Sequence, residues 1–547
     1  MSRVRLLFLL PVALLAYVLP LNWRGLWIPD ESRYAQIGQE LWRSGDWVVP
    51  HFLGLPYFEK PIGGYWTQAI AQALLGDSLL SVRLVPLLAG FATAALVVRL
   101  TRLIWGDRQL ALLTGVLYLS CLAIAASATY VTLDAQFAFW TTLSLLALWQ
   151  AQAATTLGVA LRNWALLGLA CGCGLLTKGF LALVLPVLVA LPFFVWQRRL
   201  LELICRGPLA VIVAALVVAP WALWVAQRDG DYWNFFFWHE HIQRFASDDA
   251  QHERPFWFYG PILLVAILPW TGLLPRTLGN LWQQRSHTGT AFLGITFVSQ
   301  LIFFSLSRGK LPTYLLPAMA ALVPLIARAV FDAYRTGQWQ PLRLNGGANL
   351  LLGILSLGAL LIFDDRLYGR GDNLAWALAL LAPLGFILAG LGALLWPRQT
   401  MLAPTLAIWL VLPLLTLALP KGLVYNKLPS VFVQEQLRKL NPAHLLVSND
   451  LGVAASMAWA TRRSNVVIVG GPGELKYGFE RRPDSGRLLD DGELPNWIEE
   501  HRREGSIAVL LRMGGDSDDR LLASLPATSD KVVNERLVLL VYPRTAR

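Results

Sequence analysis

Long apolar stretches separated by short polar segments constrain this chain more than any other feature. A helix needs ~20 predominantly apolar residues to cross a bilayer, because every backbone polar group must be paired within the segment. Many windows of that length occur before residue 420. Only 15% of residues are charged, against about 25% in soluble domains. The sequence therefore excludes an ordinary globular protein and predicts a polytopic α-helical membrane protein.

We expect thirteen membrane spans, of which the proline-containing windows are the weakest because proline marks kinks and boundaries. The predicted spans cover residues 4–22, 82–104, 108–128, 132–152, 162–178, 180–197, 206–226, 256–275, 289–306, 311–331, 348–364, 374–396 and 401–419.

The distribution of arginine predicts the orientation of these spans. Arg3 and Arg5 precede the first apolar run, as in a secretory signal, but no small-residue cleavage site follows, which favours an uncleaved helix. With a cytoplasmic N-terminus, arginines concentrate in the cytoplasmic segments, as the positive-inside rule requires. Topology thus explains the net charge of +11 without a nucleic-acid partner. The long first loop, at about residues 23–81, and the C-terminal tail then lie outside the cytoplasm.

The chain divides into a transmembrane domain at residues 1–419 and a soluble α/β domain at residues 420–547. Strand candidates at 444–449, 465–470, 507–512 and 537–542 alternate with helical stretches at 453–460, 493–503 and 518–524, which predicts βαβ units and a small sheet. The segment Gly470-Gly471-Pro472-Gly473 lacks the Lys-Ser/Thr ending of a nucleotide phosphate loop. We therefore expect no nucleotide cofactor.

The first loop carries polar residues that allow two interpretations. Pro29 and the acids at Asp30 and Glu31 are typical of a helix start, where acids stabilise the N-terminus. Alternatively, Asp30 faces a cavity at the membrane surface as a catalytic or substrate-orienting carboxylate, with Arg33 one turn away to hold an anion. Glu59-Lys60 is likewise either a solvated pair or part of such a cavity.

Ionisable residues also gather at other span ends on the same side. A charge next to hydrocarbon costs ~2.5–3.5 kcal/mol at a helix centre and is usually functional. Snorkelling of lysines to the surface is the alternative, but it does not explain why carboxylates, cations and tyrosines share one side. Together these groups suit a sugar joined to a lipid phosphate. The span-end residues are Asp134, Lys178, Arg308 and Lys310.

A segment containing two histidines follows the seventh span. His239 and His241 are two residues apart and would point to different faces of a helix, which disfavours a closed two-histidine zinc site. One histidine with Glu59 remains compatible with a loosely held divalent metal, zinc or magnesium. Arg244, about one turn further on, is placed to join Lys60 in holding a phosphate.

The motifs Gly25-Leu-Trp-Ile-Pro-Asp-Glu-Ser-Arg-Tyr34, Tyr57-Phe-Glu-Lys-Pro61, Thr177-Lys-Gly179, His239-Glu-His241 and Leu311-Pro-Thr-Tyr314 resemble those of the bacterial lipid A aminoarabinose transferases. This family belongs to the polyprenyl-phosphate glycosyltransferases of the GT-C fold. The resemblance covers essentially the whole chain and is strongest in the first loop. Distant relatives have an Asp-x-Asp motif where this chain has Asp30-Glu31.

The resemblance implies transfer of 4-amino-4-deoxy-L-arabinose from undecaprenyl phosphate to lipid A, by a monomer in the bacterial inner membrane with a periplasmic active site. It also implies resistance to polymyxin and other cationic peptides. By position, Asp30 resembles the catalytic carboxylate, Lys60 and Arg244 the carrier-phosphate site with Arg33 nearby, Glu59 and His239 the metal-contacting positions, and Tyr57, Asp134, Lys178 and Tyr314 the lining of the sugar and acceptor cavity.

Two other functions remain open. A related transferase would act on a protein hydroxyl, as polyprenyl-phosphate mannosyltransferases do, and would need a true general base. A transporter or lipid flippase would place polar residues near the bilayer midplane, often within inverted repeats. The one-sided polar residues and the lack of a visible repeat disfavour the transporter.

Overall fold

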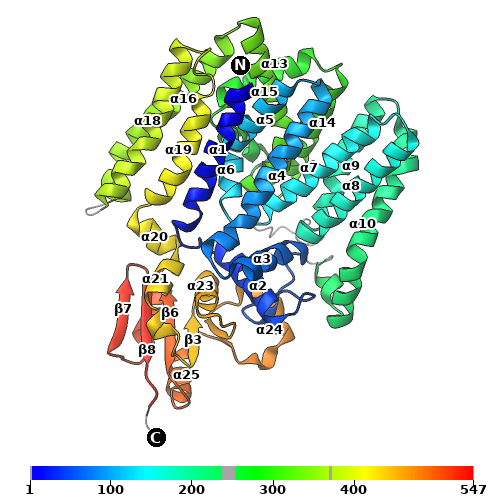
Figure 1. The fold of residues 1–547 in the computed structure, drawn as a ribbon. Helices are drawn as coiled ribbons and strands as arrows, with labels where there is room; N and C mark the ends of the chain where they lie inside the picture. The colour runs from blue at the N-terminus through cyan, green and yellow to red at the C-terminus, as the bar shows by residue number, and fades with distance from the viewer. Residues whose placement is uncertain (1–2, 237–252, 369–371, 546–547) are drawn as a thin grey trace. The chain divides into compact units, whose positions relative to one another are not determined.

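The structure, a computed structural model, describes residues 3–236, 253–368 and 372–545 (Figure 1). The chain forms two compact units. The helical unit comprises Met1–Leu21, Arg83–Asp364 and Trp376–Ala418, and the mixed unit comprises Asn22–Val82, Asp365–Ala375 and Leu419–Arg547. The first loop thus shares a unit with the C-terminal segment, whereas the sequence analysis places it within a domain of residues 1–419.

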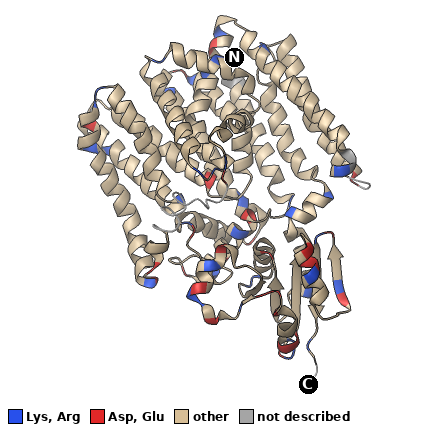
Figure 2. Ribbon diagram, turned by 180° about the vertical axis from the view of Figure 1, so that it is seen from behind, with Lys and Arg blue, Asp and Glu red and all other residues tan. Residues whose placement is uncertain are grey.

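Long apolar helices make up the helical unit, and most of its charged residues lie near helix ends (Figure 2). The helices are α1 (Arg3–Val18), α4 (Leu79–Trp105), α5 (Arg108–Ser120), α6 (Leu122–Ala128), α7 (Asp134–Gln152), α8 (Leu157–Lys178), α9 (Leu181–Trp196), α10 (Leu200–Arg228), α12 (Tyr259–Ala266), α13 (Leu274–Gln283), α14 (Thr288–Leu306), α15 (Leu316–Thr336), α16 (Gln340–Ile362), α18 (Asn373–Leu395) and α19 (Ala403–Leu417).

The predicted polytopic helical architecture is confirmed, but the count of thirteen spans is not. Among the described residues, seven helices are long and apolar enough to cross a membrane, or up to ten if each bent pair forms one span. The pairs bend by 66° between α5 and α6, by 110° in 256–283 and by 78° after α19. Two further predicted spans, 4–22 and 180–197, fall on shorter apolar helices. Local hydropathy located the helices, but it did not reveal where the backbone turns.

The helix α15 forms the centre of the helical unit. Of its most apolar window, 89% is buried, compared with 28% for α10 and 22% for α16. It packs against α5, α7 and α14. At the periphery, α8 packs closely on α10 through glycine: a Cβ added at Gly168 would lie 2.3 Å from the Ala210 carbonyl oxygen. Small residues allow such close helix approach where lipid supplies no hydrophobic driving force.

A six-stranded sheet forms the core of the mixed unit's C-terminal part. Its order is β5-β4-β3-β6-β8-β7; β5, β4, β3 and β6 are parallel, and β8 is antiparallel to both of its neighbours, β6 and β7. The sequence predicted four of these strands. The strands are β3 (Leu445–Ser448), β4 (Val466–Val469), β5 (Leu488–Leu489), β6 (Ile507–Arg512), β7 (Asp530–Asn534) and β8 (Leu537–Tyr542).

The predicted βαβ pattern is confirmed by β3, α23 and β4. The strand β4 is apolar throughout and β6 is apolar up to its last residue, Arg512, as expected of strands covered on both faces. Helices of this part are α20 (Lys421–Lys427), α21 (Pro429–Glu435), α22 (Leu437–Leu440), α23 (Leu451–Thr461), α24 (Lys476–Arg481), α25 (Leu494–His501) and α26 (Asp516–Ser524). The short helix α17 (Asp364–Leu367) begins in the helical unit, and its remaining residues belong to the mixed unit.

The first loop is folded as α2 (Asp30–Ser44), β1 (His51–Phe52), β2 (Leu55–Pro56) and α3 (Gly63–Leu75). Buried amides tie it to α23. The Gln72 side chain donates to the Ala35 carbonyl at 2.9 Å and accepts from the Trp459 indole at 3.0 Å. The Gln39 amide in turn donates to the Trp459 carbonyl at 3.0 Å. Since buried polar groups are costly without partners, these bonds fix α2 and α3 against the C-terminal segment.

Replacing Gly168 with valine should destabilise the helical unit, because the new side chain meets the backbone of α10. We expect a loss of about 1–3 kcal/mol, seen as a lower thermal midpoint of the detergent-solubilised protein. Gly158→Val, in the same helix with nothing within 4 Å of an added Cβ, serves as the control. Equal midpoints for the two variants would contradict close packing of α8 on α10.

Candidate functional site

The candidate site in the mixed unit begins at the N-terminus of α2. Asp30 and Glu31 occupy the first turn of this helix and follow Pro29. The helix-start interpretation is therefore confirmed, and it leaves open what each carboxylate does. The two acids have different surroundings, because Glu31 is fully buried whereas the Asp30 side chain is 33% exposed.

Arg33 bridges two carboxylates. Its Nη2 donates to Asp30 Oδ1 at 2.5 Å, and its Nη1 forms a close ion pair with Glu474. Tyr57 Oη donates to the same Glu474 carboxylate at 3.1 Å. The structure thus brings together three sequence-predicted residues, Asp30, Arg33 and Tyr57, around one that the sequence analysis missed.

Glu474 lies in the loop after β4, just beyond the Gly-Gly-Pro-Gly segment. From the sequence, that segment is excluded as a nucleotide phosphate loop because it lacks the Lys-Ser/Thr ending. The sequence signal that could have identified Glu474 is an acid shortly after a predicted strand, since side chains beyond the carboxyl ends of parallel strands recur in binding sites.

The electrostatics of this cluster keep its groups charged. Burial alone would lower the pKa of the Arg33 guanidinium, but the surrounding tyrosines and carboxylates raise it well above its usual value. Burial likewise opposes ionisation of Glu474, yet Arg33, Tyr57 and Lys60 hold the pKa of its carboxyl below the ordinary value. Burial raises the pKa of the Tyr57 phenol well above its usual range. At neutral pH the cluster therefore holds a guanidinium, an ionised Glu474 and an intact phenol.

Lys60 and Glu59 lie beyond Tyr57 on the first loop. The Lys60 ammonium donates to the backbone carbonyl of Glu59 at 2.6 Å, and it also acts electrostatically on Glu474. An ammonium near an ion-paired arginine is an arrangement that can bind a phosphate, because both groups form charge-assisted hydrogen bonds with anions.

Glu31 has a structural role. Its carboxylate forms a buried ion pair with Arg24 and accepts a hydrogen bond from the Trp27 backbone N–H at 2.9 Å. These contacts close the turn that precedes α2. Glu31 is therefore committed to holding the helix start, which leaves Asp30 as the carboxylate of this pair with an accessible side chain.

A second cluster lies in the helical unit. Lys178, at the end of α8, forms a close ion pair with Asp134, at the start of α7. The Lys178 ammonium also lies 4.8 Å from the ring centroid of Tyr314. The structure thus brings together three residues that the sequence analysis assigned to one cavity. Both side chains of the ion pair are only 12% exposed.

Lys310 does not snorkel to solvent, as one interpretation of the sequence allowed. It is 4% exposed, and its ammonium donates to the Arg254 carbonyl at 2.9 Å and to the Ser307 carbonyl. The lysine therefore fixes the turn between α14 and α15.

Two predicted site residues, His239 and Arg244, lie outside the described residues. Within 3–236, 253–368 and 372–545, no group of three histidine, cysteine, aspartate or glutamate side chains is placed to hold a metal. The divalent metal expected on Glu59 and His239 stays a prediction, and we assign it no chemical step.

Glu31→Gln should destabilise the mixed unit more than Asp30→Asn does. Removing one member of a buried ion pair typically costs about 3–5 kcal/mol, whereas Asp30 is partly solvated. We expect the thermal midpoint of the purified protein to fall clearly for Glu31→Gln and little for Asp30→Asn. The reverse order would refute the structural role of Glu31.

The Glu474 ion pair should make stability depend on acidic pH. Because the pKa of this carboxyl lies below its unfolded value of about 4.3, its charge stabilises the fold above that value, and the effect is lost as pH falls through the folded pKa. The difference in thermal midpoint between wild type and Glu474→Gln should therefore be complete above about pH 5 and shrink on acidification. Glu504→Gln, on an exposed residue, should show no such pattern; a pH-independent difference would argue against the pair.

Two family models match this chain. Residues 1–236 match the family described as dolichyl-phosphate-mannose-protein mannosyltransferase, and residues 424–541 match the C-terminal domain of arabinosyl transferase ArnT. Among solved structures, ArnT from Cupriavidus metallidurans is similar in its apo state (TM-score 0.80) and bound to undecaprenyl phosphate (TM-score 0.82), each at 23% identity. The apo comparison covers 98% of this chain and 97% of that one, and the bound comparison covers 99% and 98%. These structures establish the shared fold.

Relatives of full length establish the family. The undecaprenyl phosphate-alpha-4-amino-4-deoxy-L-arabinose arabinosyl transferase of Pseudomonas aeruginosa PAO1 is 47% identical over 547 residues, which is 100% of both chains. The second such transferase of Pseudomonas fluorescens Pf0-1 is 43% identical over 552 residues, again 100% of both. This chain is an integral membrane glycosyltransferase that belongs to the family of undecaprenyl phosphate-aminoarabinose arabinosyl transferases.

Proposed function

We propose that this protein transfers 4-amino-4-deoxy-L-arabinose from undecaprenyl phosphate to a phosphate of lipid A in the bacterial inner membrane. The full-length identity of 47% with the P. aeruginosa enzyme, whose name gives this sugar and carrier, carries the proposal. Adding a cationic sugar to lipid A lowers its negative charge. The expected consequence is weaker attraction of polymyxin and other cationic peptides.

The arginine distribution supports a specific orientation. We infer a cytoplasmic N-terminus, with the first loop and the C-terminal domain in the periplasm, because the positive-inside rule is then obeyed. The enzyme would act there as a monomer on lipids of the outer leaflet.

Cations of the first loop, together with Arg244, suit the carrier phosphate. In this proposal Lys60 and Arg244 hold the phosphate, and Arg33 contributes through its charge. Arg33 stays protonated because its carboxylate and tyrosine neighbours raise the pKa of its guanidinium. The ion pairs with Asp30 and Glu474 keep that guanidinium in one position.

The reaction is a direct displacement at the anomeric carbon. An acceptor phosphate oxygen forms the new bond to that carbon, while the bond to the carrier phosphate oxygen breaks and its electron pair leaves with undecaprenyl phosphate. The acceptor is already anionic at neutral pH, since the second pKa of a phosphate monoester is about 6. Asp30 therefore need not remove a proton, and it would orient the sugar and stabilise positive charge developing on the ring.

The remaining predicted residues suit recognition of the sugar and acceptor. Tyr57 retains its phenolic proton, because burial raises the pKa of that group; the proton is donated to Glu474, which leaves the phenolic oxygen to accept a hydrogen bond from the sugar. The paired Asp134 and Lys178 with Tyr314 offer an acceptor, a cation and an aromatic ring in one place.

A second candidate is transfer to a protein hydroxyl. The match of residues 1–236 to the mannosyltransferase family favours it. A hydroxyl must lose a proton during attack, so Asp30→Asn should then be more severe than loss of any cation. The match of residues 424–541 to the C-terminal domain of arabinosyl transferase ArnT favours the aminoarabinose transferases over the mannosyltransferases.

Asp30→Asn and Lys60→Ala should each abolish aminoarabinose modification of lipid A in cells that lack any other copy of the activity. Loss of one electrostatic contact to the transition state costs on the order of 10²–10³ in rate. Mass spectrometry of lipid A, with protein amounts checked by immunoblot, measures the effect. Asp484→Asn and Lys531→Ala, which remove similar charges at exposed positions of the same unit, should leave modification intact. Near-normal modification in both site variants would contradict the roles assigned to Asp30 and Lys60.

A further inference from the structure

A cavity of about 370 Å³ opens in the mixed unit at the carboxyl ends of β3, β4 and β6. From β3 the chain first builds β4 and β5 on one side, and then β6 on the other. The sheet therefore reverses its winding between β3 and β6. In open α/β sheets, ligands bind outside the carboxyl ends of the strands at such a switch point.

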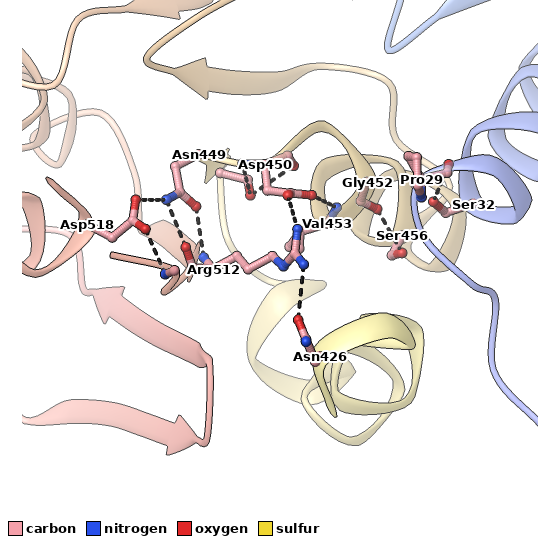
Figure 3. Close-up of polar contacts among 12 residues, drawn as sticks. Pro29, Ser32, Asn426, Asn449, Asp450, Gly452, Val453, Ser456, Arg512 and Asp518 are labelled. Carbon is pink, nitrogen blue, oxygen red and sulfur yellow. Dashed lines mark hydrogen bonds and ion pairs between the residues drawn. The ribbon is translucent and has the colours of Figure 1, made fainter. Parts of the chain in front are cut away.

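A polar clamp, which includes residues that line the cavity, lies across that switch point (Figure 3). The Arg512 guanidinium donates to Asp450 at 2.7 Å and to the Asn426 side chain at 3.0 Å. Asn449 accepts from the Arg512 backbone N–H at 2.8 Å. These bonds hold the ends of β3 and β6 together and neutralise the Asp450 carboxylate.

Donors without partners surround this clamp. Within the part of the chain that the structure describes, no hydrogen bond or ion pair involves the Lys427 ammonium, which lines the cavity from α20. The backbone N–H groups of Leu451 and Gly452 at the start of α23 are also uncommitted, as are those of Gly471 and Gly473 after β4, again counting described residues alone. All four residues line the same cavity.

A buried arginine adds an independent observation. Arg33 lines the cavity and is only 8% exposed, yet its Nε has no hydrogen-bond partner in the structure as described. Its two terminal nitrogens are occupied by Asp30 and Glu474. Of the three cations that line the cavity, Arg33 and Arg512 are paired with carboxylates, whereas Lys427 is not. The lining thus offers N–H donors and one uncommitted cation.

We propose that this cavity binds a sugar phosphate. Backbone N–H groups at a helix start and in a glycine-containing loop are favourable donors to phosphate oxygens, and Lys427 supplies the unpaired positive charge. The size lies within the ~300–1,000 Å³ of small-molecule sites, which accommodates a monosaccharide with its phosphate. Asp450 and Asn449 provide acceptors for sugar hydroxyls.

A nucleotide fits this site less well. The loop lacks the lysine that follows a nucleotide phosphate loop, and Pro472 interrupts its run of N–H donors. The sugar phosphate can come from the headgroup of a lipid acceptor or from a soluble molecule. Assigning it to the acceptor rests on the proposed function, whereas binding of the sugar phosphate itself does not.

The test uses the full-length protein in lipid nanodiscs. Binding of glucosamine 1-phosphate is measured by calorimetry, and the KM for lipid A is measured with the lipid-linked aminoarabinose donor. Lys427→Ala removes the free cation, and Gly471→Val projects methyl groups into a position where an added Cβ meets nothing within 4 Å. Lys531→Ala and Gly492→Val, exposed positions away from the cavity, are the matched controls.

We expect Lys427→Ala to weaken glucosamine 1-phosphate binding on the order of tenfold, as for loss of a charge-assisted hydrogen bond. Gly471→Val should weaken it by a similar factor because its methyl groups occupy space that the ligand needs, while the controls bind normally. A matching rise in the KM for lipid A, with kcat unchanged, assigns the site to the acceptor headgroup; an unchanged KM assigns it to a soluble sugar phosphate. Unchanged binding and unchanged KM in both variants would overturn the inference. Absence of transfer by wild type, with Lys427-dependent binding intact, would instead refute the proposed function alone.

Discussion

The ion pair between Arg33 and Glu474 is the contact on which the candidate site depends. It joins the helix that carries Asp30 to a loop at the end of a strand in the C-terminal sheet. A guanidinium buried to this extent would be strongly unfavourable without such partners. The C-terminal segment therefore supplies the counterion that allows a cation to stand beside Asp30, and the mixed unit is part of the site rather than an appendage.

The helical architecture was readable from the sequence because hydropathy over ~20 residues is a local property. The same is true of the apolar strands β3, β4, β6 and β8. The bends inside long apolar windows were not predicted, as between α5 and α6 at Cys121. Local hydropathy contains no information on where the backbone bends between two apolar helices. The short strand β5 was missed because it is only Leu488–Leu489, too brief to give a pattern.

The candidate site was only partly predictable. Asp30, Arg33 and Tyr57 could be identified as candidate site residues because they lie in one unusually polar and aromatic loop. Glu474 is separated from Arg33 by 441 residues, and no periodicity links them. Asp30 and Glu31 are adjacent acids that the sequence could not tell apart; their difference arises from Arg24, which folds back to bind Glu31. Such pairings are tertiary, so they emerge only when the folded backbone is known.

The buried amide contacts that join α2 and α3 to α23 also dictate when the first loop can complete its fold. Gln39 meets its partner Trp459 across 420 residues of chain. At about 5–20 residues per second, synthesis of that interval takes roughly 20–80 s. During this time the first loop is already synthesised, but α23, whose Trp459 binds Gln39 and Gln72 in the folded protein, is not. The first loop must therefore stay incompletely folded and hydrated while nearly all of the membrane helices are inserted.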